Sequence, residues 1–330
     1  MMNEKLLEVE NLIRVFTVSQ GGVFSRKRAV VRAVDGVNFS ISRGETLGLV
    51  GESGCGKTTL SRCLIRLIEP TSGRIRFEGI DVLGLNWNEL RRLRAKLQII
   101  YQDPYSSLDP RKRILDIVAE PMVIHRSGSK EQIRSRVVEL LEEVGLGAQH
   151  LNVFPHELSG GQRQRINIAR ALALHPQFII ADEPVSALDV SIQAQVLNLI
   201  LRLQKKFELT YLFISHDLRV VEHMSDRIAV MYLGRIVETG KTDEIYTNAF
   251  HPYTQALIQS MPSIAAGARR SKILKGEIPS PINPPEGCYF HPRCIKKEET
   301  CAHQFPELRE VNPGHWVACH LHVRWRNQKN

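Results

Sequence analysis

The stretch Gly51-Glu52-Ser53-Gly54-Cys55-Gly56-Lys57-Thr58 decides the fold of this chain. It fits the pattern G-x-x-x-x-G-K-[ST], in which glycines let backbone N–H groups turn toward one point without a Cβ in the way. Lys57 is expected to reach the β- and γ-phosphates of a nucleotide as a point charge, and the Thr58 hydroxyl to ligate Mg²⁺. We therefore predict a phosphate site formed by Gly51, Ser53, Gly54, Cys55, Gly56, Lys57, Thr58 and Thr59.

The residues on either side of this loop predict a strand and a helix. Residues 45–50 are predicted to form a short buried strand that enters the loop. Residues 57–69 carry apolar side chains at helical spacing, which predicts a helix with one buried face. A helix N-terminus directed at the phosphates would add its dipole to the loop. The members of that predicted face are Leu60, Cys63, Leu64, Leu67 and Ile68.

A second candidate anion site lies about a hundred residues later. Leu158-Ser159-Gly160-Gly161-Gln162 opens a stretch with apolar residues at helical spacing, and Ser159 is a good N-cap. A Ser-Gly-Gly turn at a helix start offers N–H groups and the positive end of a helix dipole. Two phosphate sites far apart in sequence suggest a nucleotide held between two protein surfaces.

Two adjacent carboxylates follow an apolar strand. Phe178-Ile179-Ile180-Ala181 is bounded by prolines and predicts a fully buried strand of a parallel sheet, with Asp182 and Glu183 at its carboxyl end. Open α/β sheets bind ligands at this end of their strands. Asp182 is suited to hold Mg²⁺ through the hydration shell of the ion, and Glu183 is suited to orient or deprotonate the attacking water.

Taken in order, these motifs resemble those of the ATP-binding cassette (ABC) ATPases. The phosphate loop resembles Walker A, residues 158–162 the signature motif and residues 178–183 Walker B. Gln102, between the first two, resembles the Q-loop glutamine. Phe16 resembles the aromatic residue that stacks on adenine, with Phe24 as a rival. Ser186-Ala187-Leu188-Asp189 and Ser215-His216-Asp217 resemble the D-loop and the switch histidine.

The resemblance implies two composite ATP sites in a head-to-tail dimer. Ser159, Gly160 and Gly161 would cover the γ-phosphate of the nucleotide bound by a partner subunit, and Gln162 and Asp189 are further implied nucleotide-binding residues. Thr58, Gln102 and Asp182 would approach Mg²⁺. Glu183 would activate water, and His216 would contact the γ-phosphate. Lys57 and Gln102 complete the implied catalytic set.

Length and composition predict one large domain with an appendage. The chain has 330 residues, and eight of its sixteen prolines lie from Pro262 onward. We predict a nucleotide-binding domain at 1–260 and a loop-rich extension at 261–330. The domain would be an α/β P-loop core with an N-terminal antiparallel β-subdomain and a helical subdomain at about 105–165. No apolar run is long enough to span a bilayer, and the N-terminus has no apolar signal core.

The tail resembles one branch of the ABC family, the ATPase subunits of dipeptide and oligopeptide importers, and most closely their F-type subunit. The matching stretches are 251–257, 276–280 and 285–294. The resemblance implies ATP-driven peptide import and a paralogous ATPase subunit, or a homodimer in isolation. It also implies two permease subunits, an extracytoplasmic peptide-binding protein and a place on the cytoplasmic side of the plasma membrane. The transported solute could instead be nickel or another small molecule.

A soluble ABC protein acting on nucleic acid or the ribosome is a less favoured alternative. The net charge of +9 would suit nucleic acid or an anionic membrane surface. Such soluble ABC proteins usually carry two cassettes in one chain or a long coiled-coil insertion. In this sequence each motif occurs once, and no sustained heptad run is present. We therefore expect no nucleic-acid partner.

Four of the six cysteines lie in the tail: Cys288, Cys294, Cys301 and Cys319. Their spacing does not match the C-x₂-C pairs common in zinc sites, whereas a four-thiolate iron–sulfur cluster tolerates wider spacing. The importer resemblance implies a [4Fe–4S] cluster here. Zinc stays open as an alternative because His291, His303, His315 and His320 lie nearby in sequence, and four free thiols are the remaining possibility. Cys55 and Cys63 are expected to be packing residues.

Overall fold

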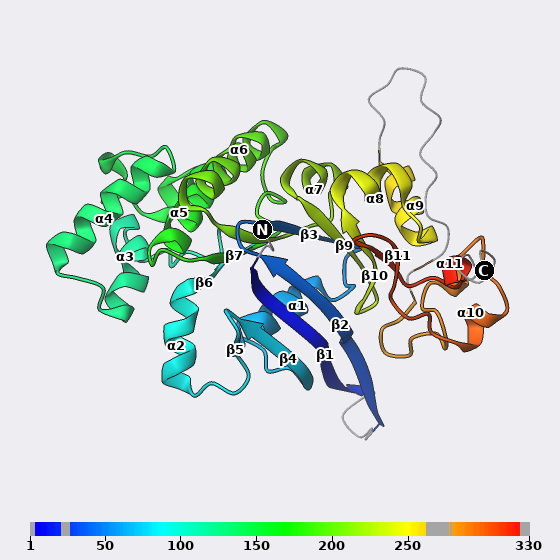
Figure 1. Cartoon of the computed structure of the whole chain (residues 1–330). Coiled ribbons are helices and arrows are strands. Elements are labelled where there is room, and N and C mark those ends of the chain that lie inside the picture. Colours follow the sequence, from blue (N-terminus) through cyan, green and yellow to red (C-terminus); the bar gives the residue numbers. More distant parts are fainter. Residues whose placement is uncertain (1–3, 21–26, 262–276, 278, 324–330) are drawn as a thin grey trace, which may run out of the picture. The chain divides into compact units, whose positions relative to one another are not determined.

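The computed structural model describes residues 4–20, 27–261, 277 and 279–323 of the chain (Figure 1). The chain divides into two compact units, which we describe separately. The first unit comprises Met1–Lys5, Ile41–Thr46 and Gly84–Ser215. The second unit comprises Leu6–Ser40, Leu47–Leu83 and His216–Asn330.

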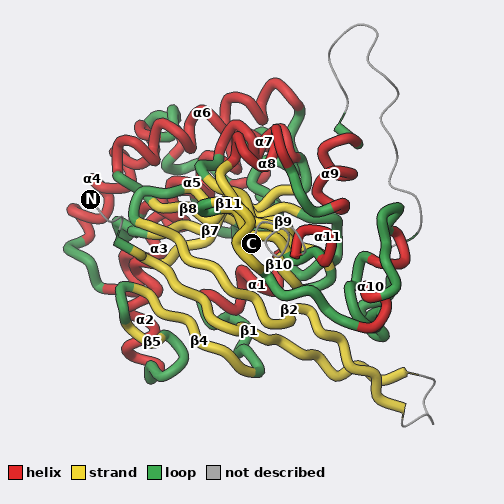
Figure 2. Tube along the Cα trace, turned by 45° about the vertical axis from the view of Figure 1, so that its right-hand side comes forward, coloured by secondary structure: helices red, strands yellow, loops and turns green. Residues whose placement is uncertain are grey.

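The second unit contains the predicted antiparallel β-subdomain, a four-stranded sheet in the order β2-β1-β4-β5 (Figure 2). Leu7 pairs with Phe77 and Val9 with Ile75, and all four side chains are buried. The residues between them are charged, because alternate side chains of a strand point to opposite faces of the sheet. The strands are β1 (Lys5–Gln20), β2 (Lys27–Ser42), β4 (Ser72–Phe77) and β5 (Ile80–Asp81).

The second unit also holds the strand that enters the phosphate loop. This strand, β3, pairs in parallel with β9, and antiparallel pairs then join β9 to β10, β10 to β12 and β12 to β11. The two last strands belong to the C-terminal segment, so this segment extends the same run of strands. Their bounds are β3 (Thr46–Val50), β9 (Arg227–Tyr232), β10 (Arg235–Lys241), β11 (Arg309–Asn312) and β12 (His315–Val317).

The helix after the phosphate loop, α1 (Lys57–Leu64), is shorter than predicted. Leu60, Cys63 and Leu64 are buried, as the apolar spacing indicated. The predicted continuation to residue 69 is wrong, because Arg66 adopts a φ of 51° and turns the chain out of the helix. Leu67 is consequently 48% exposed. The other helices of this unit are α7 (Leu218–Met224), α8 (Thr242–Asn248), α9 (Pro252–Gln259), α10 (Thr300–His303) and α11 (His320–Val323), with a 3₁₀ turn at His291–Arg293.

The first unit contains three parallel strands, in the order β8-β7-β6. Every residue of β7 (Phe178–Asp182) and β8 (Thr210–Ser215) is buried, which explains their continuous apolar sequences. β6 (Leu97–Ile100) completes the set. Parallel pairing places Asp182 beside Ile214 near the carboxyl ends of both strands, so this end of the unit gathers the predicted acidic residues.

The helices of the first unit include a group formed by α3, α4 and α5 (Figure 1). Val137, Leu140 and Leu141 of α4 are buried, as their spacing predicted. Ser129 and Gln132 form a capping box that starts this helix. The helices are α2 (Trp87–Lys96), α3 (Ile114–His125), α4 (Lys130–Glu143), α5 (Gly160–Leu172) and α6 (Val190–Phe207), with 3₁₀ turns at Ala148–His150 and Pro155–Glu157.

Candidate active site

The phosphate loop of the second unit closes around its own lysine. Lys57 is only 5% exposed, and its Nζ donates hydrogen bonds to the carbonyl oxygens of Gly51 at 2.7 Å and Glu52 at 3.1 Å. The ammonium group therefore lies inside the curve of the loop. This is where a point charge must be to meet bound phosphates.

Gly56 joins the loop to α1 and has to be glycine. Its φ of 109° is rarely adopted by residues with a side chain. A Cβ at this position would lie 2.0 Å from the carbonyl oxygen of Ala33. Gly56 also offers no side chain to cap α1. The backbone N–H groups in the first turn of this helix are therefore left to ligands or to groups of the loop.

The other predicted residues of the loop differ in exposure. Ser53 and Gly54 are exposed, and Thr58 and Thr59 are half-buried in the first turn of α1. Cys55 is buried, and burial raises the pKa of its thiol, which agrees with the predicted packing role. These exposures leave Ser53 and Gly54 accessible to a ligand.

Phe16, the predicted adenine-stacking residue, lies on β1 of the second unit. The guanidinium of Arg14 sits 4.4 Å from the centre of its ring, so one aromatic face already has a cationic partner. Adenine stacking by Phe16 stays a prediction. The rival, Phe24, lies outside the described residues.

The first unit brings Gln102 and Glu183 together. Gln102 Nε2 donates a hydrogen bond to Glu183 Oε2 at 3.0 Å. The Glu183 N–H donates to the carbonyl of Ile214 on β8 at 2.9 Å, and its φ of 48° lies in the left-handed region. Such backbone in a residue other than glycine is uncommon and clusters at functional sites. Asp182, one residue earlier, is 4% exposed.

The predicted signature residues begin α5 of the first unit. The Ser159 hydroxyl accepts from the Gln162 N–H at 3.3 Å, and the Gln162 side-chain oxygen accepts from the Ser159 N–H at 3.0 Å. This capping box fixes the Gly160–Gly161 turn. Gly161 is packed so closely that a Cβ would lie 2.6 Å from Cγ2 of Ile192 on α6, whereas at Gly160 the nearest atom would be 3.4 Å away. Asp189 is exposed and precedes α6.

His216 follows directly after β8 and is exposed. The next residue, Asp217, caps α7 by accepting from the Arg219 N–H at 2.9 Å. The second unit contains the phosphate loop, Phe16 and His216. Gln102, Asp182, Glu183, Asp189 and residues 159–162 belong to the first.

The four tail cysteines line one small pocket of the second unit, together with His251, His291 and His320. Burial raises the pKa of Cys288 to about 11 and that of Cys319 to about 12, and neighbouring thiol groups add to both shifts. Four thiolates are the donor set of a [4Fe–4S] cluster. Within the described ranges, however, no three or more His, Cys, Asp or Glu side chains form a metal-binding group.

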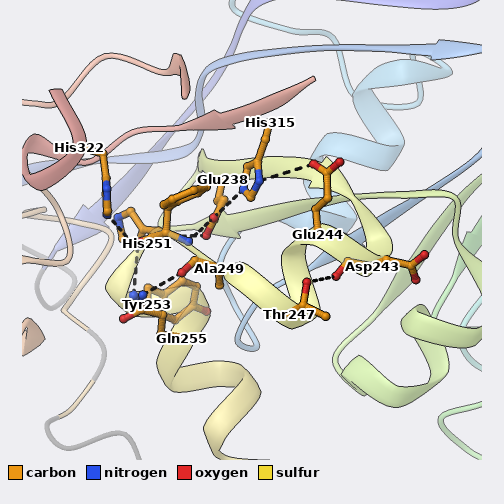
Figure 3. A network of polar contacts seen from close by, with 11 residues as sticks. Glu238, Asp243, Glu244, Thr247, Ala249, His251, Tyr253, Gln255, His315 and His322 are labelled. Atoms are coloured by element: carbon orange, nitrogen blue, oxygen red, sulfur yellow. Dashed lines mark hydrogen bonds and ion pairs between the residues drawn. The ribbon is translucent and has the colours of Figure 1, made fainter. Parts of the chain in front are cut away.

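His315, one of the histidines that kept zinc open, lies in a different set of contacts (Figure 3). Its Nε2 is 2.9 Å from a carboxylate oxygen of Glu238, which is fully buried on β10. Glu238 also accepts from the N–H groups of Phe250 at 2.6 Å and His251 at 3.0 Å. Burial lowers the pKa of His251 to about 4, so its ring is neutral at ordinary pH. Sequence reasoning missed Glu238, because its partners lie up to 77 residues away and no local pattern joins them.

The phosphate loop, the buried parallel strands and the acidic pair at the carboxyl end of β7 define an ATPase of the ABC class. Residues 34–186 match the family model described as ABC transporter, and residues 237–301 match that of the oligopeptide/dipeptide transporter C-terminal region. Among the residues that the structure covers, no helix has the length and apolar character needed to cross a membrane.

Curated relatives match almost the whole chain. The chain is 53% identical over 323 residues to the oligopeptide transport ATP-binding protein AppF of Bacillus subtilis, covering 97% of this chain and 98% of the relative. It is 50% identical to a probable peptide ABC transporter ATP-binding protein of Sinorhizobium fredii, covering 97% and 91%. The chain belongs to the family of ATP-binding subunits of oligopeptide and dipeptide ABC transporters.

Solved structures support the same fold. The ATP-binding cassette MJ0796, in a dimeric post-hydrolysis state bound to ADP and Pi, matches with a TM-score of 0.63 and 29% identity, covering 72% of this chain and 98% of that one. CbiO1 of Clostridium perfringens, part of an ABC transporter complex, matches with a TM-score of 0.63 and 27% identity, covering 74% and 92%. The predicted P-loop ABC ATPase fold is confirmed.

Proposed function

We propose that this chain is the ATP-binding and ATP-hydrolysing subunit that powers import of di- and oligopeptides through a membrane ABC transporter. The observation that carries the proposal is the combination of two features in one chain. The ABC motifs supply the ATPase, and residues 237–301 match the C-terminal region of oligopeptide and dipeptide transporters. The relatives named as peptide or oligopeptide transport proteins support the same substrate class.

We propose the following roles for the site residues. Lys57 binds the β- and γ-phosphates, and the Glu183 carboxylate takes a proton from the attacking water as general base. The hydrogen bond from Gln102 Nε2 to Glu183 Oε2 helps to orient that carboxylate. His216 contacts the γ-phosphate, and residues 159–162 and Asp189 complete the site of a partner subunit.

Mg²⁺ fits the donors proposed for it. Thr58, Gln102 and Asp182 offer only oxygen ligands, which Mg²⁺ prefers. When bound with ATP, the ion neutralises charge on the β- and γ-phosphates. Asp182 is the last residue of the fully buried strand β7, which fixes the position of its backbone.

The proposed assembly contains a paralogous ATPase subunit, two permease subunits and an extracytoplasmic peptide-binding protein. The ATPase chain would lie on the cytoplasmic side of the plasma membrane and would not touch the peptide itself. ATP would join the two ATPase subunits head to tail, and hydrolysis would separate them. The Gln102 loop would transmit this movement to a permease.

Glu183→Gln tests the ATPase mechanism. The variant keeps the shape of the side chain but removes its basicity, so it should bind ATP like the wild-type chain. It should lose hydrolysis and accumulate as a dimer in ATP, measured by phosphate release and size-exclusion chromatography. Lys57→Ala is the matched control, because it should fail to dimerise. Retained turnover in Glu183→Gln would reject Glu183 as the base.

Uptake by cells that lack this chain tests the substrate class. Labelled di- and oligopeptides should accumulate only when the wild-type chain is restored, and Glu183→Gln should not restore uptake. If the wild-type chain restores nickel uptake and leaves peptide uptake unchanged, the chain serves an importer of nickel. If the chain associates with ribosomes or DNA rather than with membrane permeases, it is a soluble ABC protein that acts on nucleic acid or the ribosome.

We further propose that Cys288, Cys294, Cys301 and Cys319 bind an iron–sulfur cluster. Their shared pocket supports this, although the four side chains would have to draw together around the cluster. Zinc is the alternative, and His291 and His320 are the histidines that line the same pocket. Protein purified without oxygen should be brown and contain iron. Colourless protein with stoichiometric zinc would reject the cluster.

A further inference from the structure

Glu52 places a carboxylate inside a loop that has to bind phosphates. A negative charge beside a polyanion opposes binding unless a cation compensates it. In this structure both carboxylate oxygens of Glu52 accept hydrogen bonds from Arg293, at 2.7 Å and 3.0 Å. The Arg293 side chain is only 4% exposed and that of Glu52 is 22% exposed. A two-point pair of this kind is more specific and less screened than an exposed ion pair.

Arg293 reaches the loop from 241 residues away, within the C-terminal segment. It ends the 3₁₀ turn at His291–Arg293, and its N–H donates to the Phe290 carbonyl at 3.0 Å. The guanidinium carbon lies 5.9 Å from the ring centres of both Phe290 and Tyr232. The turn and the two rings thus hold the guanidinium in place at Glu52.

A second contact holds the backbone of the same residue. The Glu52 N–H donates to the hydroxyl of Tyr253 at 3.0 Å. Tyr253 is fully buried near the start of α9, with its ring centre 4.6 Å from that of Tyr232. Both the side chain and the main chain of Glu52 are therefore fixed by residues that follow position 250.

We propose that Arg293 is a positioning residue for ATP binding, which neutralises Glu52 and, with Tyr253, holds the phosphate loop in its binding shape. Lys57 is linked to the same point, because its Nζ donates to the Glu52 carbonyl at 3.1 Å. Loss of Arg293 leaves an unpaired carboxylate in the loop and loosens the group that Lys57 contacts. The proposal rests on ATP binding by this loop and is independent of the transported solute.

The test is a double-mutant cycle on Arg293 and Glu52. The affinity of each full-length variant for a fluorescent ATP analogue is measured by titration. Arg293→Ala should weaken binding about tenfold, a change of about 1.4 kcal/mol. Arg293→Ala combined with Glu52→Gln removes both charges and should recover most of that loss. Arg309→Ala is the matched control, because its pair with Glu307 is exposed, and it should bind as the wild type does. In ATPase assays Arg293→Ala should raise KM more than it lowers kcat.

Two results would overturn the inference. One is wild-type affinity in Arg293→Ala. The other is an equal loss in the single and double variants, which indicates a merely structural role. If Arg293→Ala does not fold, Arg293→Lys replaces it, because one ammonium cannot form both hydrogen bonds, and unchanged affinity there also overturns the inference. A wild-type chain that does not bind ATP would instead refute the ATPase function itself.

Discussion

Gly56→Ala should destabilise the nucleotide-free chain far more than an alanine elsewhere in the same loop. Gly56 has a φ of 109°, and the added Cβ would lie 2.0 Å from the Ala33 carbonyl oxygen and 3.0 Å from Cε of Met231. The backbone strain is about 1–3 kcal/mol. The forced separation of packed atoms adds about 1–3 kcal/mol. The free energy of unfolding should therefore fall by about 2–6 kcal/mol, the sum of these two ranges.

Gly54→Ala provides the matched control for this prediction. Gly54 also has a positive φ, of 79°, but a Cβ there would meet no atom within 4 Å. Only the backbone strain remains, so the loss should be about 1–3 kcal/mol. Urea denaturation without nucleotide, followed by circular dichroism, measures both variants. Equal destabilisation by the two alanines would refute the argument from the Ala33 contact.

Two further predictions concern charges. Lys57→Ala should weaken ATP binding about 10- to 150-fold, because a hydrogen bond to a charged group contributes about 1.5–3 kcal/mol. Unchanged affinity in a fluorescence titration would reject the phosphate loop. Burial alone would raise the pKa of Asp35, but Arg235 at 2.7 Å, together with hydrogen bonds from Tyr289 and Arg32, holds that pKa below its usual value. The stability that Asp35 contributes is thus full above about pH 3.9 and is lost as the pH falls further, so the difference in stability between the wild type and Asp35→Asn should shrink below that pH.

Local patterns were enough to predict the elements that carry the site. The phosphate loop, the buried strand before Asp182 and the capped helix at Ser159 each depend on residues close together in sequence. For α1 the same reasoning failed, because apolar spacing continues past Leu64 while the backbone turns at Arg66. A single positive φ in a residue other than glycine leaves no mark in the sequence.

Contacts between distant segments could not be predicted. The pairing of Glu238 on β10 with Val317 on β12 joins residues that share no motif. The same is true of Arg293 and Glu52. The high proline content after position 261 indicated a loop-rich extension, and it gave no sign that β12 there pairs with β10 and that β11 pairs with β12. Such pairings depend on tertiary packing rather than on local propensity.

Strand β11 is an edge strand of the β-sheet in the second unit. Its first two residues, Arg309 and Glu310, carry opposite charges and are exposed. Charged side chains on an edge strand discourage a foreign strand from docking there. A chain that stopped before residue 309 would lose both this edge strand and β12, and would bare the polar backbone of β10. Chains truncated before residue 309 should therefore be prone to aggregate, even where their catalytic residues are intact.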